Sequence, residues 1–285
     1  YLGTANTKIY GNLAEVINRG FDVAVNYSKR INRDLSIQFQ GTFTYNNNEI
    51  SVYDEAPGTR SAMKRQGKNV NTVWGYVADG LYIDKADIAN SPTSTLGNIA
   101  IAPGDIKYVD QPDRDGKYDG RITSDDQVPL GVSVPKIIYG FGPSVGYKNW
   151  DFSVFFQGRG NVALMLSDIQ PFGSSYRRGV LEFIDEDHWS PDNQNPNAKY
   201  PRLTDNYNNH NTAWSSYWLR NGRFLKLKNA EIGYSLKNMR FYVNGTNLLT
   251  FSPFKQWDPE MGGGNYTTKY PTQMTINVGV QLTLN

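Results

Sequence analysis

The sequence predicts an all-β fold, in the form of an antiparallel transmembrane β-barrel segment of about seven or eight strands with long loops at one end. Three observations lead to this prediction. Apolar and polar residues alternate over segments of about ten residues, short and long connections follow one another in order, and aromatic residues make up 13% of the chain. These features are typical of a sheet that crosses a lipid bilayer with one apolar face.

The last strand shows the alternation most clearly. Its apolar residues occupy every second position, with small or polar residues between them: Met274, Ile276, Val278, Val280, Leu282 and Leu284. A period of two places one kind of side chain on each face of a strand. A tilted strand needs about 9–11 residues to cross a bilayer, whereas strands of soluble sheets are usually about five or six residues long. The length of this segment therefore favours a membrane strand.

Six earlier segments follow the same pattern. They begin near residues 20, 35, 137, 150, 224 and 239. Their alternating apolar residues include Phe21, Leu35, Trp150 and Ile232. Together with the last segment they predict seven strands.

The connections between these strands alternate in length. Lys148-Asn149 and Lys237-Asn238 form two tight turns, and residues near 29–34 form a third. The long connections are predicted at about 47–136, 160–223 and 251–272. Outer-membrane barrels have short periplasmic turns and longer extracellular loops, so we expect extracellular long loops and a periplasmic C-terminus. A soluble sandwich with irregular loops is the alternative.

Seven strands leave two open edges, one near residue 20 and one at 273–285. Unpaired backbone groups at an edge find no water in lipid, and bacterial single-chain barrels have even strand numbers. We therefore expect the chain to pair with strands from another segment.

The composition excludes several classes of protein. The 29 Lys and Arg residues nearly balance the 27 Asp and Glu residues, so no nucleic-acid partner is expected. The chain has no cysteine, which excludes disulfides, thiolate metal sites and cysteine nucleophiles. No apolar run approaches the roughly 20 residues of a membrane-spanning helix.

Five loop and strand segments carry more specific motifs, in a fixed order. They are 74–82 (WGYVADGLY), 103–110 (PGDIKYVD), 188–202 (HWSPDN…YPR), 218–234 (WLRNGRFLKLKN…GY) and 242–271 (YVNGTNLLT…DPE…YP). Together they resemble the SusC/RagA family of TonB-dependent outer-membrane transporters, over nearly the whole chain.

This resemblance implies a 22-stranded barrel with an N-terminal plug inside it, importing oligosaccharides or peptides with energy delivered through TonB. It identifies residues 1–285 as the C-terminal part of such a barrel, with the plug domain and N-terminal strands absent. The implied partners are a SusD-like surface lipoprotein, the rest of the barrel and plug in the same or a separate chain, TonB through that plug, and outer-membrane lipid. The implied location is the outer membrane of a Gram-negative, Bacteroidota-like bacterium.

The acidic stretch 110–126 is a candidate calcium loop. The family often carries a calcium-like sequence here, and Ca²⁺ prefers six to eight oxygen ligands from closely spaced carboxylates. The candidate ligands are Asp113, Asp115, Asp119 and Asp126. Lys117 stands where the spacing calls for an oxygen, so a solvated acidic turn is the alternative.

The densest aromatic cluster in the long loops is Trp214, Tyr217 and Trp218. Aromatic faces can stack on sugar rings or peptide groups, so these residues are candidate substrate-binding residues. The alternative is that they pack within the loops or belong to an interfacial aromatic belt.

No enzyme site is predicted. The two histidines, His188 and His210, are far apart in sequence, and both are expected to be solvated loop residues. No nucleophile elbow, phosphate loop or H-E-x-x-H motif is present.

Three functional hypotheses follow. The first is the outer-membrane β-barrel component of a SusCD-like nutrient importer. The alternative is a SusC-like barrel that acts as a structural or assembly subunit of a larger outer-membrane complex. A weaker alternative is a soluble glycan-binding β-protein.

Overall fold

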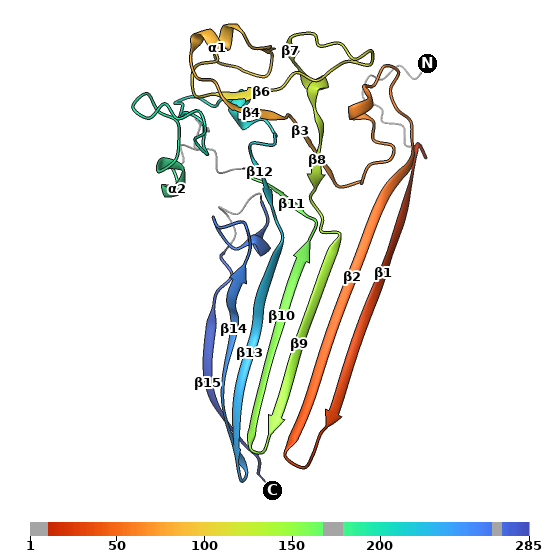
Figure 1. Ribbon diagram of the computed structural model, residues 1–285, viewed down its shortest axis with the longest axis vertical. Coiled ribbons are helices and arrows are strands. Elements are labelled where there is room, and N and C mark those ends of the chain that lie inside the picture. Colours follow the sequence, from red (N-terminus) through yellow and green to blue (C-terminus); the bar gives the residue numbers. More distant parts are fainter. Residues whose placement is uncertain (1–10, 168–178, 264–269, 285) are drawn as a thin grey trace, which may run out of the picture.

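The computed structural model describes residues 11–167, 179–263 and 270–284, and it confirms the all-β fold. Seven long strands form one antiparallel sheet in the order β1-β2-β9-β10-β13-β14-β15, which does not close into a barrel (Figure 1). The strands are β1 (Ala14–Arg30), β2 (Leu35–Tyr53), β9 (Ile137–Tyr147), β10 (Trp150–Gly160), β13 (Phe224–Leu236), β14 (Met239–Phe251) and β15 (Thr275–Leu282). All seven predicted strands are therefore present.

The first hairpin is longer than the sequence pattern predicts. Strand β2 continues to Tyr53, so the first long connection begins at residue 54 and not near 47. Asn46, Asn47 and Asn48 interrupt the apolar alternation, and asparagine is a poor strand former. The backbone of Asn46 nevertheless pairs with Gly20, and that of Asn48 pairs with Asn18. Pairing with β1 outweighs the local preference.

The short turns lie at the end of the sheet opposite the long connections (Figure 1). Lys148 and Lys237 each adopt φ 53° in their two-residue turns. In the link between β1 and β2, the Asn32 Oδ1 atom accepts hydrogen bonds from the backbone N–H groups of Asp34 (2.9 Å) and Leu35 (2.8 Å). These contacts confirm the three predicted short links.

The two faces of the sheet differ in polarity. On the apolar face, Phe152 lies opposite Val145 on β9 and Ile232 on β13. Phe152 and Ile232 are each 46% exposed, and the same face continues to Val278, which is 80% exposed. Soluble monomers rarely expose apolar patches that extend over a whole sheet. An apolar face of this extent, on strands of 8 to 19 residues, fits a lipid environment.

The long connections form a layer of short elements at one end of the sheet (Figure 1). Its strands are β3 (Thr72–Gly75), β4 (Ala78–Leu81), β5 (Thr93–Ser94), β6 (Ile106–Tyr108), β7 (Arg121–Ile122), β8 (Val128–Val132), β11 (Ala163–Met165) and β12 (Leu219–Asn221). Its helices are α1 (Lys85–Ala89), α2 (Glu182–Asp185) and α3 (Asn209–Thr212), with 3-10 turns η1 (Ser61–Met63), η2 (Ser124–Asp126) and η3 (Pro259–Met261). Strands β5 and β7 pair in parallel, and the other pairs are antiparallel.

The main hydrophobic core lies in this loop layer and not against the sheet. Ile106, Ile184 and Trp218 are fully buried there, and residues from all three long connections contribute to the core. The first and second connections are also joined through the backbone, because Tyr76 N–H donates to the Trp214 carbonyl at 2.9 Å. The long loops thus pack as one body on top of the sheet.

None of the helices in the described ranges is long and apolar enough to span a membrane.

Candidate functional site

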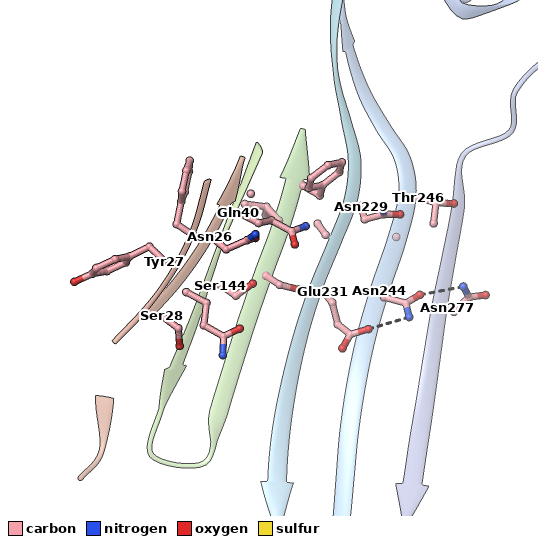
Figure 2. A pocket seen from close by; sticks show the side chains of 18 residues that line it. Asn26, Tyr27, Ser28, Gln40, Ser144, Asn229, Glu231, Asn244, Thr246 and Asn277 are labelled. Carbon is pink, nitrogen blue, oxygen red and sulfur yellow. Dashed lines mark hydrogen bonds between the residues drawn. The ribbon is translucent and has the colours of Figure 1, made fainter. Parts of the chain in front are cut away.

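The polar face of the sheet forms a hollow of about 740 Å³ (Figure 2). Every one of the seven long strands contributes a polar side chain to its lining. These side chains include Asn26, Gln40, Ser144, Ser153, Asn229, Glu231, Asn244, Thr246 and Asn277. Amides and hydroxyls can both donate and accept hydrogen bonds, so this face can bind a polar molecule or protein surface.

A chain of polar contacts crosses four of the strands on this face. Asn277 donates to the Asn244 Oδ1 atom at 3.0 Å, and Asn244 donates to Glu231 at 3.1 Å (Figure 2). Arg240 then pairs with Glu231 at 2.6 Å and with Asp151. The contacts link β15, β14, β13 and β10, and the single Arg240 guanidinium offsets part of the charge of the two carboxylates.

The segment after β14 folds back over the loop end of this face. Lys226 of β13 is fully buried, and its Nζ atom contacts Asp258 at 2.5 Å and Glu260 at 2.9 Å. Arg159 of β10 donates to the Pro259 carbonyl at 2.6 Å. We call residues 252–263 the strap, because these contacts hold it against two strands.

The acidic groups of the strap stay ionised. Burial acts to raise the pKa of Asp258, but hydrogen bonds from Lys226 and the backbone outweigh it and lower the pKa below its usual range. The pKa of Glu260 is also lowered, because hydrogen bonds from Lys228 and Lys226 exceed the opposing effect of burial. The strap is therefore held by charge pairs.

The three predicted aromatic binding residues differ in burial. Trp218 is fully buried and donates its Nε1–H to the Asn211 carbonyl at 2.7 Å, so it is a core residue and not a surface for a ligand. Tyr217 is partly buried, and its hydroxyl donates to the Ala198 carbonyl at 2.8 Å. Trp214 is 52% exposed and remains a candidate binding residue.

Trp214 has neighbours that the sequence did not single out. It lines a hollow of about 460 Å³ with Trp74, Tyr76, Gln127 and Asn209, which come from three separate segments of the chain. Of these neighbours, Trp74 and Tyr76 belong to the WGYVADGLY motif, whereas no sequence signal points to Gln127 or Asn209.

The predicted calcium ligands do not gather into one site. Asp126 is fully buried and accepts hydrogen bonds from the backbone N–H groups of Gln111 (2.9 Å) and Thr123 (2.7 Å), and from Arg60 at 3.3 Å. Asp113 instead accepts from the N–H groups of Asp115 and Lys117 at the exposed tip of the loop. In the described ranges no group of three or more His, Asp or Glu side chains could hold a metal ion.

The predicted calcium ligands already contact other groups of the protein. Backbone N–H groups and the Arg60 guanidinium take the positions that a cation would need around Asp126, and Asp119 lies 3.7 Å from the same guanidinium. One further acid, Asp110, is buried, and this burial raises its pKa. Calcium in this loop stays a prediction that the geometry does not support.

His210 is buried, contrary to the prediction of a solvated loop residue. Its Nε2 atom lies 2.6 Å from the Ile106 carbonyl and its Nδ1 atom 3.0 Å from the Ser94 hydroxyl. Burial lowers its pKa, so the ring is neutral at pH 7. Its bonds join the first and second long connections and leave it no access to a reactant.

His188 also makes no catalytic pair. Its Nδ1 atom lies 2.8 Å from the carbonyl oxygen of Asp185, three residues earlier. The contact is local to the loop.

Comparison with known proteins reveals relatives over nearly the whole chain, although no family model matches the sequence. The chain is 26% identical to the TonB-dependent receptor P3 of Formosa agariphila, over 94% of this chain and 27% of the relative. It is 28% identical to the TonB-dependent receptor P26 of the same organism, over 95% of this chain and 29% of the relative. It is 21% identical to the TonB-dependent receptor SusC of Bacteroides thetaiotaomicron, over 97% of this chain and 27% of the relative.

Solved structures show the same fold. The structure of the RagAB peptide transporter has a TM-score of 0.68 with this chain at 21% identity, covering 96% of this chain and 30% of that one. The chain therefore spans less than a third of the length of these relatives. The proteins named here are receptors and transporters, and none is named as an enzyme. The comparisons confirm what the five motifs predicted, that the chain resembles a segment of the SusC/RagA-type TonB-dependent transporters.

Proposed function

We propose that this chain is the C-terminal part of the barrel wall, and part of the loop cap, of an outer-membrane nutrient importer of the SusC/RagA type. The observation that carries the proposal is the two-faced sheet. Its apolar outer face suits lipid, and its polar inner face lines a hollow of about 740 Å³. Strands with one apolar and one polar face, covered at one end by packed loops, are suited to form the wall of a barrel around a polar passage.

The relatives support the finer parts of the proposal. In the complete protein, a barrel of 22 strands holds a plug that responds to TonB, and a SusD-like lipoprotein covers the loop layer. The loops face the cell exterior and the C-terminus faces the periplasm. The cargo is an oligosaccharide or a peptide, and the chain catalyses no reaction.

The import proposal is tested in the source bacterium by deleting the gene of the complete transporter. We expect growth to be lost on one class of oligosaccharide or peptide as sole carbon source and retained on its monomers, because monomers pass general porins. Inactivating TonB should give the same loss.

A complemented strain is the control. Unchanged growth on every oligosaccharide and peptide tested, together with loss of outer-membrane integrity in the deletion strain, would instead favour the structural or assembly role.

A further inference from the structure

We propose that the hollow around Trp214 is a binding subsite for an uncharged sugar ring, a site that rests on the proposed import function and specifies the cargo. The hollow lies in the loop layer and has a volume of about 460 Å³. Ligand pockets commonly have volumes of about 300–1,000 Å³. This hollow is open to one side and has room for one or two sugar units.

Trp214 is 52% exposed, although Trp218, only four positions later, is completely buried in the core. A large aromatic side chain that stays exposed beside a well-packed core forfeits burial free energy. The exposed indole of Trp214 is suited to stacking against the apolar face of a sugar ring.

The backbone that carries this indole is rigid. The Trp214 carbonyl accepts the Tyr76 N–H at 2.9 Å, and Ser216 N–H donates back to the Tyr76 carbonyl at 2.8 Å. The Ser216 hydroxyl also accepts the N–H of Ala78 at 2.9 Å. A Cβ atom at Gly75 would collide with the Trp214 carbonyl, so only glycine permits this close approach. Binding therefore requires little reordering of the site.

The polar groups of the hollow are amides that have free bonding capacity. Gln127 donates its Nε2–H to the Tyr76 hydroxyl at 3.4 Å, which leaves its Oε1 atom as an acceptor. Among the described residues, the side-chain amide of Asn209 and the indole N–H of Trp214 have no hydrogen-bond partner. Amides both donate and accept, which matches the hydroxyl groups of a sugar.

Among the residues that the structure describes, none that lines the hollow is Asp, Glu, Lys or Arg. A site for an acidic sugar, or for the termini of a peptide, would be expected to offer a charge of opposite sign. The combination of aromatic faces, neutral amides and absent charge therefore favours a neutral saccharide.

The proposal is tested on the complete transporter in detergent, with neutral hexasaccharides of glucose, mannose and xylose, a hexasaccharide of uronic acids, and a mixture of ten-residue peptides as probes. We expect a neutral hexasaccharide to bind in calorimetry. Trp214→Ala should weaken this binding at least about tenfold, as removal of a central aromatic anchor does, and Trp214→Phe should retain most of it. Gln127→Ala should weaken it by less.

Tyr118→Ala is the matched control, since Tyr118 is an aromatic residue of the same layer, 67% exposed and outside the hollow. The Tyr118→Ala variant should bind the neutral hexasaccharide as tightly as the unchanged transporter does. Hydrogen exchange over residues 72–82 reports whether each variant keeps the loop layer folded. If Trp214→Ala does not fold, the binding of Trp214→Phe and Gln127→Ala is compared with that of the unchanged transporter.

Binding of only the acidic or peptide probes, binding of no neutral probe, or unchanged binding in Trp214→Ala and Gln127→Ala would each overturn the subsite. These outcomes are distinct from failure of the import function. If the subsite alone is wrong, the transporter still supports growth on its cargo and the Trp214 variants do so equally well.

Discussion

At the scale of single residues, the strap shows how a buried cation holds a loop. Lys226 is 1% exposed, and its charge is matched by Asp258 and Glu260, whose own side chains are 16% and 32% exposed. A buried charge that loses its partner is costly, because no water replaces the lost interaction. The strap position therefore depends on Lys226 more than on its neighbours.

We expect Lys226→Met to release the strap. Removal of the cation leaves Asp258 without its ion-pair partner, at a cost of about 3 kcal/mol, while Glu260 keeps its contact with Lys228. Hydrogen exchange of residues 252–263 should then become about a hundredfold faster, since 1.4 kcal/mol corresponds to a factor of ten.

The matched control is Lys228→Met. Lys228 is 27% exposed and, among the described residues, forms an ion pair with Glu260 alone, so exchange should rise by less than tenfold. Equal increases in exchange for the two substitutions would contradict the prediction that buried Lys226 stabilises the strap more than Lys228 does.

At the scale of elements, each long strand presents two environments. On β13, Ile232 belongs to the apolar face and lies opposite Phe152 and Val243, while its neighbour Glu231 lines the polar hollow opposite Ser153. A one-residue change of register would exchange the two faces over the whole strand. The alternation therefore fixes the register of the sheet and which of its two faces is apolar.

We expect Ile232→Arg to impair assembly of the complete barrel. An arginine on the lipid face costs about 2–4 kcal/mol near the bilayer centre. The measurement is the fraction of protein that is folded in outer membranes, read from heat-modifiable migration in gels.

Ser153→Arg serves as the control on the opposite face of the neighbouring strand. Its new cation would lie beside Glu231 and face the polar hollow, so assembly should stay near the unchanged level. Assembly that is impaired equally by both substitutions would contradict the assignment of the faces.

At the scale of the whole molecule, the described strands form an open sheet with a packed cap at one end. Within the described part of the chain, strands β1 and β15 each pair with a single neighbour, so each presents an edge. Exposed strand edges cannot remain unpaired in lipid. We infer that both edges pair with further barrel strands in the complete protein, as the resemblance to longer relatives suggests.

The orientation of this body can be tested because the sequence has no cysteine. We expect a cysteine in place of Lys117, in the loop layer, to react with a membrane-impermeant maleimide on intact cells. A cysteine in place of Asn149, in the short turn between β9 and β10, should react only after the outer membrane is opened. The reverse pattern would invert the proposed orientation.

Prediction from sequence succeeded where a regular pattern governs structure. The alternation around Phe152, Ile232 and Val278 identified the strands and their apolar face because a strand has a fixed period of two. It failed at Asn46–Asn48, where pairing with β1 extends a strand through poor strand formers. It left open whether Trp218 binds cargo or packs within the loops, and it wrongly placed His210 in solvent, since nothing local distinguishes an aromatic or histidine residue in a core from one at a surface.

The sequence by itself determined the fold class, the seven strands, the alternation of turns and long connections, and the resemblance to SusC/RagA-type transporters. Only the tertiary structure decided which loop residues are available for binding. It buried Trp218, left Trp214 exposed beside Trp74 and Gln127, and matched Asp126 with Arg60 and not with other acids. The physical reason is that strand pattern is a local property, whereas burial in the loop layer depends on contacts between segments more than a hundred residues apart.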